Sequence, residues 1–170
     1  MENFNVIKPE SLTANPFTMI GKDWFLVTAM KDGVCNTMTA SWGGLGILWN
    51  KKVAYVVIRP QRYTNEFVDQ ADTFSLSVLD KSYRKALNYL GTVSGKDEDK
   101  IKKSGLTTVI EDNTPFFEEA HTVFICKKLF AQNLSEASFT CKELISKNYP
   151  EKDFHILYIA EIEKVLERIY

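Results

Sequence analysis

Turn-forming residues divide the first half of the chain into short runs that are rich in β-branched and aromatic side chains. The run 23–30 ends at Lys31-Asp32-Gly33, and Asp-Gly is the commonest short signal for a β-hairpin turn. A second strand is therefore expected over 34–42. The helical segments between the strands are brief and do not alternate with them regularly, which favours an antiparallel sheet over a doubly wound one. The sequence predicts a mainly β chain that forms a small antiparallel barrel with short peripheral helices.

Later runs supply the remaining elements. Further strands are expected over 53–58, 73–79, 122–126 and 154–162. The first of these is a continuous apolar run, which predicts burial on both faces. The glycines at 43, 44 and 46 are expected to break the strand before them, and Gly91 is expected to end a helix over 83–90 in a left-handed conformation.

The length and charge of the chain limit the classes of partner. Its 170 residues predict a single domain over 1–170, and its net charge of −1 leaves no surplus of basic residues for a nucleic acid. The first ten residues lack the basic and apolar regions of a signal peptide, and no apolar run is long enough to span a bilayer. We therefore expect a cytoplasmic protein that binds neither nucleic acid nor a membrane.

The three cysteines are Cys35, Cys126 and Cys141. They are odd in number and include no close pair, which argues against a disulfide framework and against a zinc site. We expect them to be reduced, packed thiols, and the sequence predicts no metal site.

Arg59, Arg62 and Thr64 stand at the expected start of a short helix over 65–71, with Thr64 as its cap. The free N–H groups and positive dipole end of a helix favour a phosphate there, and arginine can bind phosphate through two hydrogen bonds. Solvated arginines beside an ordinary cap are the alternative. The residues alone leave both interpretations open.

The strand over 36–42 has one face of small polar side chains, Thr37, Thr39 and Ser41. The other face ends at Trp42, whose ring could lie against a flat molecule, although a half-buried strand explains the same pattern. The common nucleotide, hydrolase and zinc-protease motifs are missing: the glycine run after this strand lacks the third glycine of G-x-G-x-x-G.

Five segments resemble, in order and spacing, the flavin reductase-like FMN-binding family that includes flavoredoxin. They are Met38-Thr-Ala-Ser-Trp-Gly43, Val57-Ile-Arg-Pro-Gln-Arg-Tyr-Thr64, Phe74-Ser-Leu-Ser-Val-Leu79, Leu90-Gly-Thr-Val-Ser-Gly-Lys-Asp-Glu-Asp-Lys100 and Asp153-Phe-His-Ile-Leu-Tyr-Ile-Ala-Glu-Ile162. The resemblance covers about 25–161. It implies a split β-barrel of the FMN-binding type, a homodimer, and non-covalent FMN near the subunit interface.

The resemblance also implies residue roles. It places Thr39, Ala40, Ser41 and Trp42 along the flavin ring and ribityl chain, Arg59, Arg62 and Thr64 at the phosphate, and Ser94, Gly95, Lys96 and Lys100 near the flavin. A lysine at the pyrimidine end could stabilise the anion of reduced flavin, a role open to Lys100, with an exposed charged helix face as the alternative. His155 matches a histidine of the family's closing strand and is the catalytic candidate. The usual Gly-Asp-His pattern is altered here to Asp-Phe-His, and a structural histidine is the alternative.

The implied function is redox chemistry at bound flavin. The chain would be an NAD(P)H:flavin reductase, with NAD(P)H as reductant, or an electron-transfer flavoprotein with a redox protein as partner. A non-catalytic FMN-binding module and a pyridoxamine phosphate oxidase-like oxidase are the alternatives. The sequence leaves open the electron donor and acceptor, and whether FMN stays bound or exchanges as a substrate.

Overall fold

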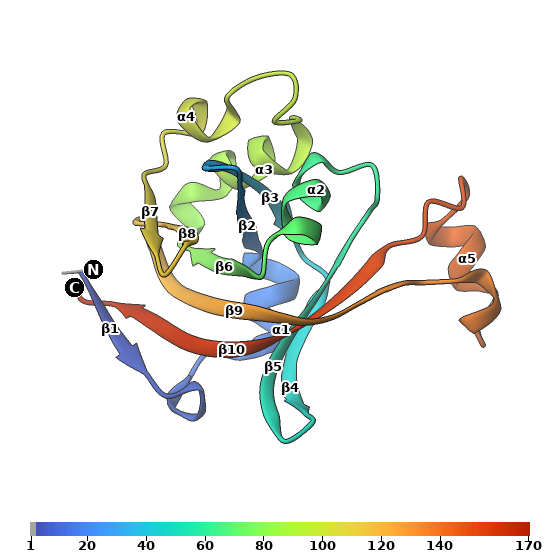
Figure 1. The fold of residues 1–170 in the computed structure, drawn as a ribbon, viewed down its shortest axis with the longest axis horizontal. Coiled ribbons are helices and arrows are strands. Elements are labelled where there is room, and N and C mark those ends of the chain that lie inside the picture. The colour runs from blue at the N-terminus through green and yellow to red at the C-terminus, as the bar shows by residue number, and fades with distance from the viewer. Residues whose placement is uncertain (1–2) are drawn as a thin grey trace.

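The computed structural model describes residues 3–170, and one strongly curved antiparallel sheet dominates it (Figure 1). Its strands are β1 (Phe4–Ile7), β2 (Phe25–Lys31), β3 (Val34–Ala40), β4 (Gly43–Leu48), β5 (Lys51–Ile58), β6 (Thr73–Leu79), β9 (Ala120–Asn133) and β10 (Ile156–Arg168). A separate hairpin pairs β7 (Thr108–Glu111) with β8 (Thr114–Phe117).

Short helices lie around this sheet. They are α1 (Pro16–Thr18), which continues into a π-helical turn over Met19–Asp23, then α2 (Tyr63–Gln70), α3 (Arg84–Thr92), α4 (Lys100–Ser104) and α5 (Glu143–Asn148), with 3₁₀ turns at Pro9–Ser11, Lys81–Tyr83 and Glu136–Ser138. Figure 1 shows α2, α3 and α4 gathered on one side of the barrel, whereas α5 sits on an arm that extends away from it. None of the helices in residues 3–170 is both long and apolar enough to cross a membrane.

The order of the strands shows that the sheet closes on itself. The order is β3-β2-β6-β9-β10-β5-β4, with β1 added along β10. β3 and β4 stand at opposite ends of this order, yet only Ser41 and Trp42 separate them in the chain. Six strand spacings would put the ends of a flat sheet about 29 Å apart, whereas three peptide steps span at most about 11 Å. The sheet therefore curls into a split barrel, and Ser41 and Trp42 cross its open seam.

The hairpin between β2 and β3 forms where the sequence predicts it. Lys31 pairs with Val34, and the two residues between them, Asp32 and Gly33, have φ values of 50° and 75°. Positive φ at both central positions matches the right-handed twist of the strands. The turn thereby sets the register that places β3, and the residues after it, along the seam.

Two apolar clusters lie on the two faces of the sheet. Alternate residues of β2, β6, β9 and β10 fill the barrel interior, where Phe74 and Tyr158 are fully buried. The opposite face of the same strands is covered by α3 and β8. Leu26 of β2, Leu90 of α3 and Phe116 of β8 are buried there. Because the central strands are covered on both faces, the barrel is a rigid support for the seam.

The strand expected over 34–42 ends at Ala40, but the glycines do not make this break, so that part of the prediction is wrong. Gly43 and Gly44 begin β4, which pairs with β5. A Cβ atom on Gly43 would lie 2.4 Å from the Tyr55 carbonyl oxygen, and one on Gly44 would lie 2.3 Å from the Tyr55 ring. These glycines are needed for close approach rather than for a break. The prediction that both faces of β5 are buried is also wrong: Tyr55 is 43% exposed, because its side chain lines a cavity instead of packing beneath another element.

Three other local predictions also differ from the structure. Gly91 lies inside α3 without a positive φ, where its lack of a side chain lets Thr39 approach. α2 begins at Tyr63, so Thr64 is its second residue and not its cap. Cys141 is exposed on the arm that carries α5, so it is not a packed thiol.

Candidate functional site

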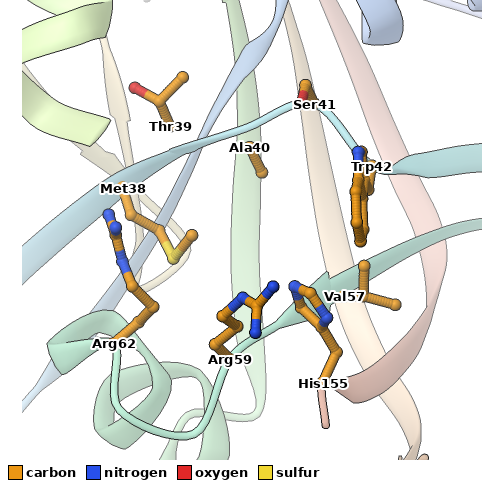
Figure 2. A pocket seen from close by; sticks show the side chains of 9 residues that line it. All are labelled: Met38, Thr39, Ala40, Ser41, Trp42, Val57, Arg59, Arg62 and His155. Atoms are coloured by element: carbon orange, nitrogen blue, oxygen red, sulfur yellow. The ribbon is translucent and has the colours of Figure 1, made fainter. Parts of the chain in front are cut away.

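A cavity of about 230 Å³ opens at the seam (Figure 2). Its walls come from the end of β3, the Ser41–Trp42 link, the end of β5, the loop into α2 and the residue before β10; the lining residues are Met38, Thr39, Ala40, Ser41, Trp42, Val57, Arg59, Arg62 and His155. The structure thus brings together seven of the site residues that the sequence singled out. We call this space the ring cavity.

Trp42 and His155 form one wall of the ring cavity. Their ring centroids are 5.2 Å apart, and Trp42 is 47% exposed. His155 is buried, with Nδ1 2.9 Å from the Tyr149 hydroxyl oxygen. Burial and then the positive charge of Arg59 lower the pKa of His155 to about 4. His155 is therefore a neutral hydrogen-bonding group at neutral pH.

Arg59 is already engaged by the base of the α5 arm. Its guanidinium pairs with the Asp153 carboxylate, donates a 2.9 Å hydrogen bond to the Asn148 carbonyl oxygen and lies 5.3 Å from the centre of the Tyr149 ring. The Asp153 pKa is lowered by hydrogen bonds from Gln61 and Arg59. Arg59 lines the ring cavity, but a carboxylate compensates its charge.

A second cavity, of about 140 Å³, lies behind the loop into α2. It is lined by Gln61, Arg62, Tyr63, Thr64, Thr92, Val93, Ser94 and Lys100. Arg62 also lines the ring cavity, so the two spaces share this side chain as part of their walls. We call this second space the polar cavity. It contains four of the residues that the sequence analysis assigned to the phosphate or to the flavin surroundings.

Arg62 and Lys100 are the two cations of the polar cavity. Arg62 Nη1 donates to the Gly91 carbonyl oxygen at 2.7 Å, and Lys100 Nζ donates to the carbonyl oxygens of Leu90 and Val93 at 3.0 and 2.9 Å. Burial and then the charge of Arg62 lower the pKa of Lys100 to about 8. The ion pairs within residues 3–170 give neither cation a carboxylate partner. An anion in this cavity would stabilise both charges.

Asn36 does not line the polar cavity but supports its wall through Thr64, and no pattern in the sequence pointed to this role. Asn36 Nδ2 donates to Thr64 Oγ1 at 2.9 Å, and both side chains are buried. A Cβ on Gly95 would lie 2.3 Å from Asn36 Oδ1, so only glycine lets the loop after α3 pass so close. The alternation of β3 gave no sign of this role, because Thr64 is distant in the sequence.

Two predicted residues are oriented away from the cavities. Lys96 is exposed and pairs with Glu66 at 2.6 Å. The Thr39 side chain donates to the Leu87 carbonyl oxygen of α3 at 2.5 Å, and Figure 2 shows it directed away from the ring cavity. Thr39 therefore contributes its backbone to the wall of the ring cavity. Lys100 lines the polar cavity and does not line the ring cavity beside Trp42.

Most of the chain matches the model of one protein family. The model of the flavin reductase like domain matches residues 19–168. The chain belongs to the flavin reductase like family. The resemblance drawn from the five segments is confirmed, and the family match extends beyond them at both ends. A comparison with curated proteins gave no match.

Solved structures agree with the flavin reductase like assignment at the level of the fold. An FMN-binding domain of a flavin reductases-like enzyme from Shewanella baltica has a TM-score of 0.71 at 19% identity, over 98% of this chain and 78% of the other. The flavoredoxin of Desulfovibrio vulgaris gives 0.66 at 23%, over 94% and 74%. An NADH:FAD oxidoreductase from Streptomyces globisporus gives 0.64 at 14%, over 85% and 74%. The split-barrel prediction is confirmed.

Proposed function

We propose that this chain binds FMN non-covalently and transfers hydride or electrons at the bound flavin. The observation that supports this most directly is that the two cavities are neighbours that share Arg62. FMN consists of a flat ring, a polyol chain and a terminal phosphate. A cavity edged by an exposed tryptophan lies next to one that holds two cations without a carboxylate partner among residues 3–170, and the pair fits such a molecule.

The polar cavity would hold the phosphate. Arg62, Thr64, Ser94 and Lys100 line it, and arginine and lysine are the usual partners of phosphate groups. Within residues 3–170, Arg62 uses one of its five N–H donors, on the Gly91 carbonyl oxygen. The others can bind oxygen atoms without loss of that contact.

The ring cavity would hold the isoalloxazine. The backbone of 39–42 offers peptide groups at its edge, and Trp42 and His155 form its wall. FMN supplies the hydride and electron chemistry when bound, and the protein supplies orientation and electrostatics. His155, neutral by burial and the charge of Arg59, would act through hydrogen bonding rather than as a cation.

Structural neighbours support two candidate activities, reduction by a nicotinamide cofactor and electron transfer between proteins. One neighbour is a flavoredoxin, and another is an NADH:FAD oxidoreductase solved with NAD and FAD fragments. We propose NAD(P)H as the reductant, with electron transfer to a redox protein as the second candidate. The test is anaerobic mixing of FMN-loaded protein with NADH and with NADPH while the visible flavin band is followed. Bleaching identifies a reductase, whereas a band that only dithionite bleaches indicates a carrier or a non-catalytic flavin protein.

The cofactor itself can be tested separately. The purified, FMN-supplemented protein should be yellow, and denaturation should release FMN that chromatography separates from FAD and riboflavin. A protein without flavin absorbance, or one that releases only FAD, would contradict the proposal.

We further propose a homodimer built on the β4–β5 hairpin. Ile47, Trp49 and Tyr55 are 71%, 54% and 43% exposed there, and Phe17, at 86%, stands across an apolar cavity of about 550 Å³ beside the seam. Clustered exposed apolar side chains mark interaction surfaces, and two-fold pairing is the commonest assembly. Light scattering should give twice the 19.5 kDa chain mass, and Ile47→Glu should shift it toward the monomer. A wild-type monomer with bound FMN would refute the proposal.

A further inference from the structure

The hydrogen bond between Thr64 and Asn36 determines whether the Thr64 hydroxyl donates or accepts toward a ligand. Thr64 is 1% exposed and lies in the first turn of α2, in the wall of the polar cavity. Its one hydrogen-bond partner among residues 3–170 is Asn36 Nδ2, at 2.9 Å. A threonine hydroxyl can donate one hydrogen bond and accept two. Whether the hydroxyl can still donate to a ligand depends on whether its hydrogen bond with Asn36 uses the proton or a lone pair.

An amide nitrogen can only donate, because it has no lone pair free to accept. Thr64 Oγ1 must therefore accept from Asn36, and the proton of the Thr64 hydroxyl remains free for another acceptor. Because Thr64 lines the polar cavity, a ligand in that cavity could supply this acceptor. If Asn36 were absent, the hydroxyl could rotate and present a lone pair there instead.

The position of Asn36 is itself fixed from two sides. β3 holds its backbone in register with β2, where Asn36 pairs with Ala29. The loop after α3 passes so close that a Cβ on Gly95 would lie 2.3 Å from Asn36 Oδ1. The loop therefore blocks movement of the amide on the side of Gly95.

We propose that Asn36 is a positioning residue that makes the Thr64 hydroxyl a hydrogen-bond donor to the phosphate of the ligand. This inference rests on the proposed binding of FMN. With Arg62 and Lys100, it gives the polar cavity donors at three separate side chains. Such a set suits an oxyanion that carries no proton. It favours a phosphate monoester in its dianionic form over ligands that must themselves donate.

The test is a double-mutant cycle on the ratio of FMN to riboflavin affinity, measured by flavin fluorescence quenching. Riboflavin lacks the phosphate, so the ratio removes effects on the ring cavity. Thr64→Val keeps the shape of the side chain and should reduce the ratio about tenfold or more. Thr64→Ser keeps the hydroxyl and should stay close to wild type. Asn36→Ser, which is too short to reach Thr64, should reduce the ratio severalfold.

The decisive comparison is the double variant. If Asn36 acts through the Thr64 hydroxyl, Asn36→Ser should add nothing to Thr64→Val. Additive losses, or a wild-type ratio in Thr64→Val, would overturn the inference. If Asn36→Ser does not fold, as circular dichroism would reveal, Asn36→Leu, which fills similar space without a donor, takes its place in the cycle with the same expected and contradicting outcomes.

Failure of the proposed function gives a different result. A wild-type protein that binds neither flavin would refute FMN binding. The donor arrangement is then probed with inorganic phosphate alone, which should raise the melting temperature of wild type, compared with chloride at equal ionic strength, and raise it less for Thr64→Val. Equal stabilisation of both proteins, or of neither, would overturn the inference as well.

Discussion

Removal of the Arg62 side chain tests the proposed phosphate site most directly. Arg62 is half-buried, lines both cavities and has no carboxylate partner among the described ion pairs. Arg62→Ala removes one charge and the donors that face the polar cavity. It also removes the 2.7 Å hydrogen bond from the charged guanidinium to the Gly91 carbonyl oxygen, which should cost about 1.5–3 kcal/mol of folding stability.

The expected loss of FMN affinity follows from the charge of the contact. A hydrogen bond to a charged group contributes about 1.5–3 kcal/mol, which is roughly a ten- to 150-fold change in the dissociation constant. Riboflavin has no phosphate, so its affinity should change much less. The ratio of FMN to riboflavin affinity should therefore fall about tenfold or more.

Arg59→Ala is the matched control. It removes the same side chain three positions earlier, but the Arg59 charge is compensated by Asp153. Arg59→Ala should loosen the base of the α5 arm and lower stability, with little change in the ratio. Titration by fluorescence quenching, with urea unfolding to confirm the fold, measures both effects. A folded Arg62→Ala protein that keeps the wild-type ratio would refute the reasoning, and a larger effect of Arg59→Ala would assign the phosphate to Arg59.

Three other predictions follow from the same contacts. The pKa of His155 is lowered to about 4, so below about pH 6.5 the unfolded chain binds a proton that the folded chain excludes. The free energy of unfolding should therefore fall by about 2 kcal/mol from pH 7 to pH 5, and by less in His155→Gln, as urea midpoints would show. An equal fall in both proteins would contradict this. Because the pKa of Lys100 is lowered to about 8, Lys100 loses its charge as pH rises, and FMN affinity should weaken between pH 7 and pH 9 in wild type but not in Lys100→Met; parallel profiles would argue against a phosphate contact. Gly95→Ala would place a Cβ 2.3 Å from Asn36 Oδ1 and should cost about 1–3 kcal/mol together with FMN affinity, whereas Gly46→Ala, with open space around its Cβ, should lose less of both. Equal effects of the two alanines would contradict the close-approach argument.

The elements near the site follow largely from local sequence. The Asp32-Gly33 turn specifies the hairpin that places β3, and both residues have the positive φ that the turn requires. Alternation over 73–79 predicts β6 with its observed bounds, Thr73–Leu79. The peptide 39–42 and Arg62 were recognisable because each belongs to a short segment of the family pattern. Turn geometry and strand period depend on neighbouring residues, so a single sequence reveals them.

The elements that the sequence missed depend on distant packing. β4 was hidden because its glycines are typical of a break, and only the nearby carbonyl group and ring of Tyr55 explain why glycine is needed in a strand. The seam depends on β3 and β4 lying at opposite ends of the strand order. No local pattern in 41–42 contains that information.

The distinction between the two arginines was also decided by the tertiary structure. Arg59 and Arg62 look equivalent in the sequence, yet Asp153, which is 94 positions away, pairs with Arg59. Asn36 reaches Thr64 over 28 positions, and Lys100 loses most of its exposure beside the end of α3. The sequence by itself determined which side chains could bind a phosphate. The closed sheet decided which of them keep charge and donors free for it, because ion pairing and desolvation depend on which groups folding brings within a few ångströms of each other.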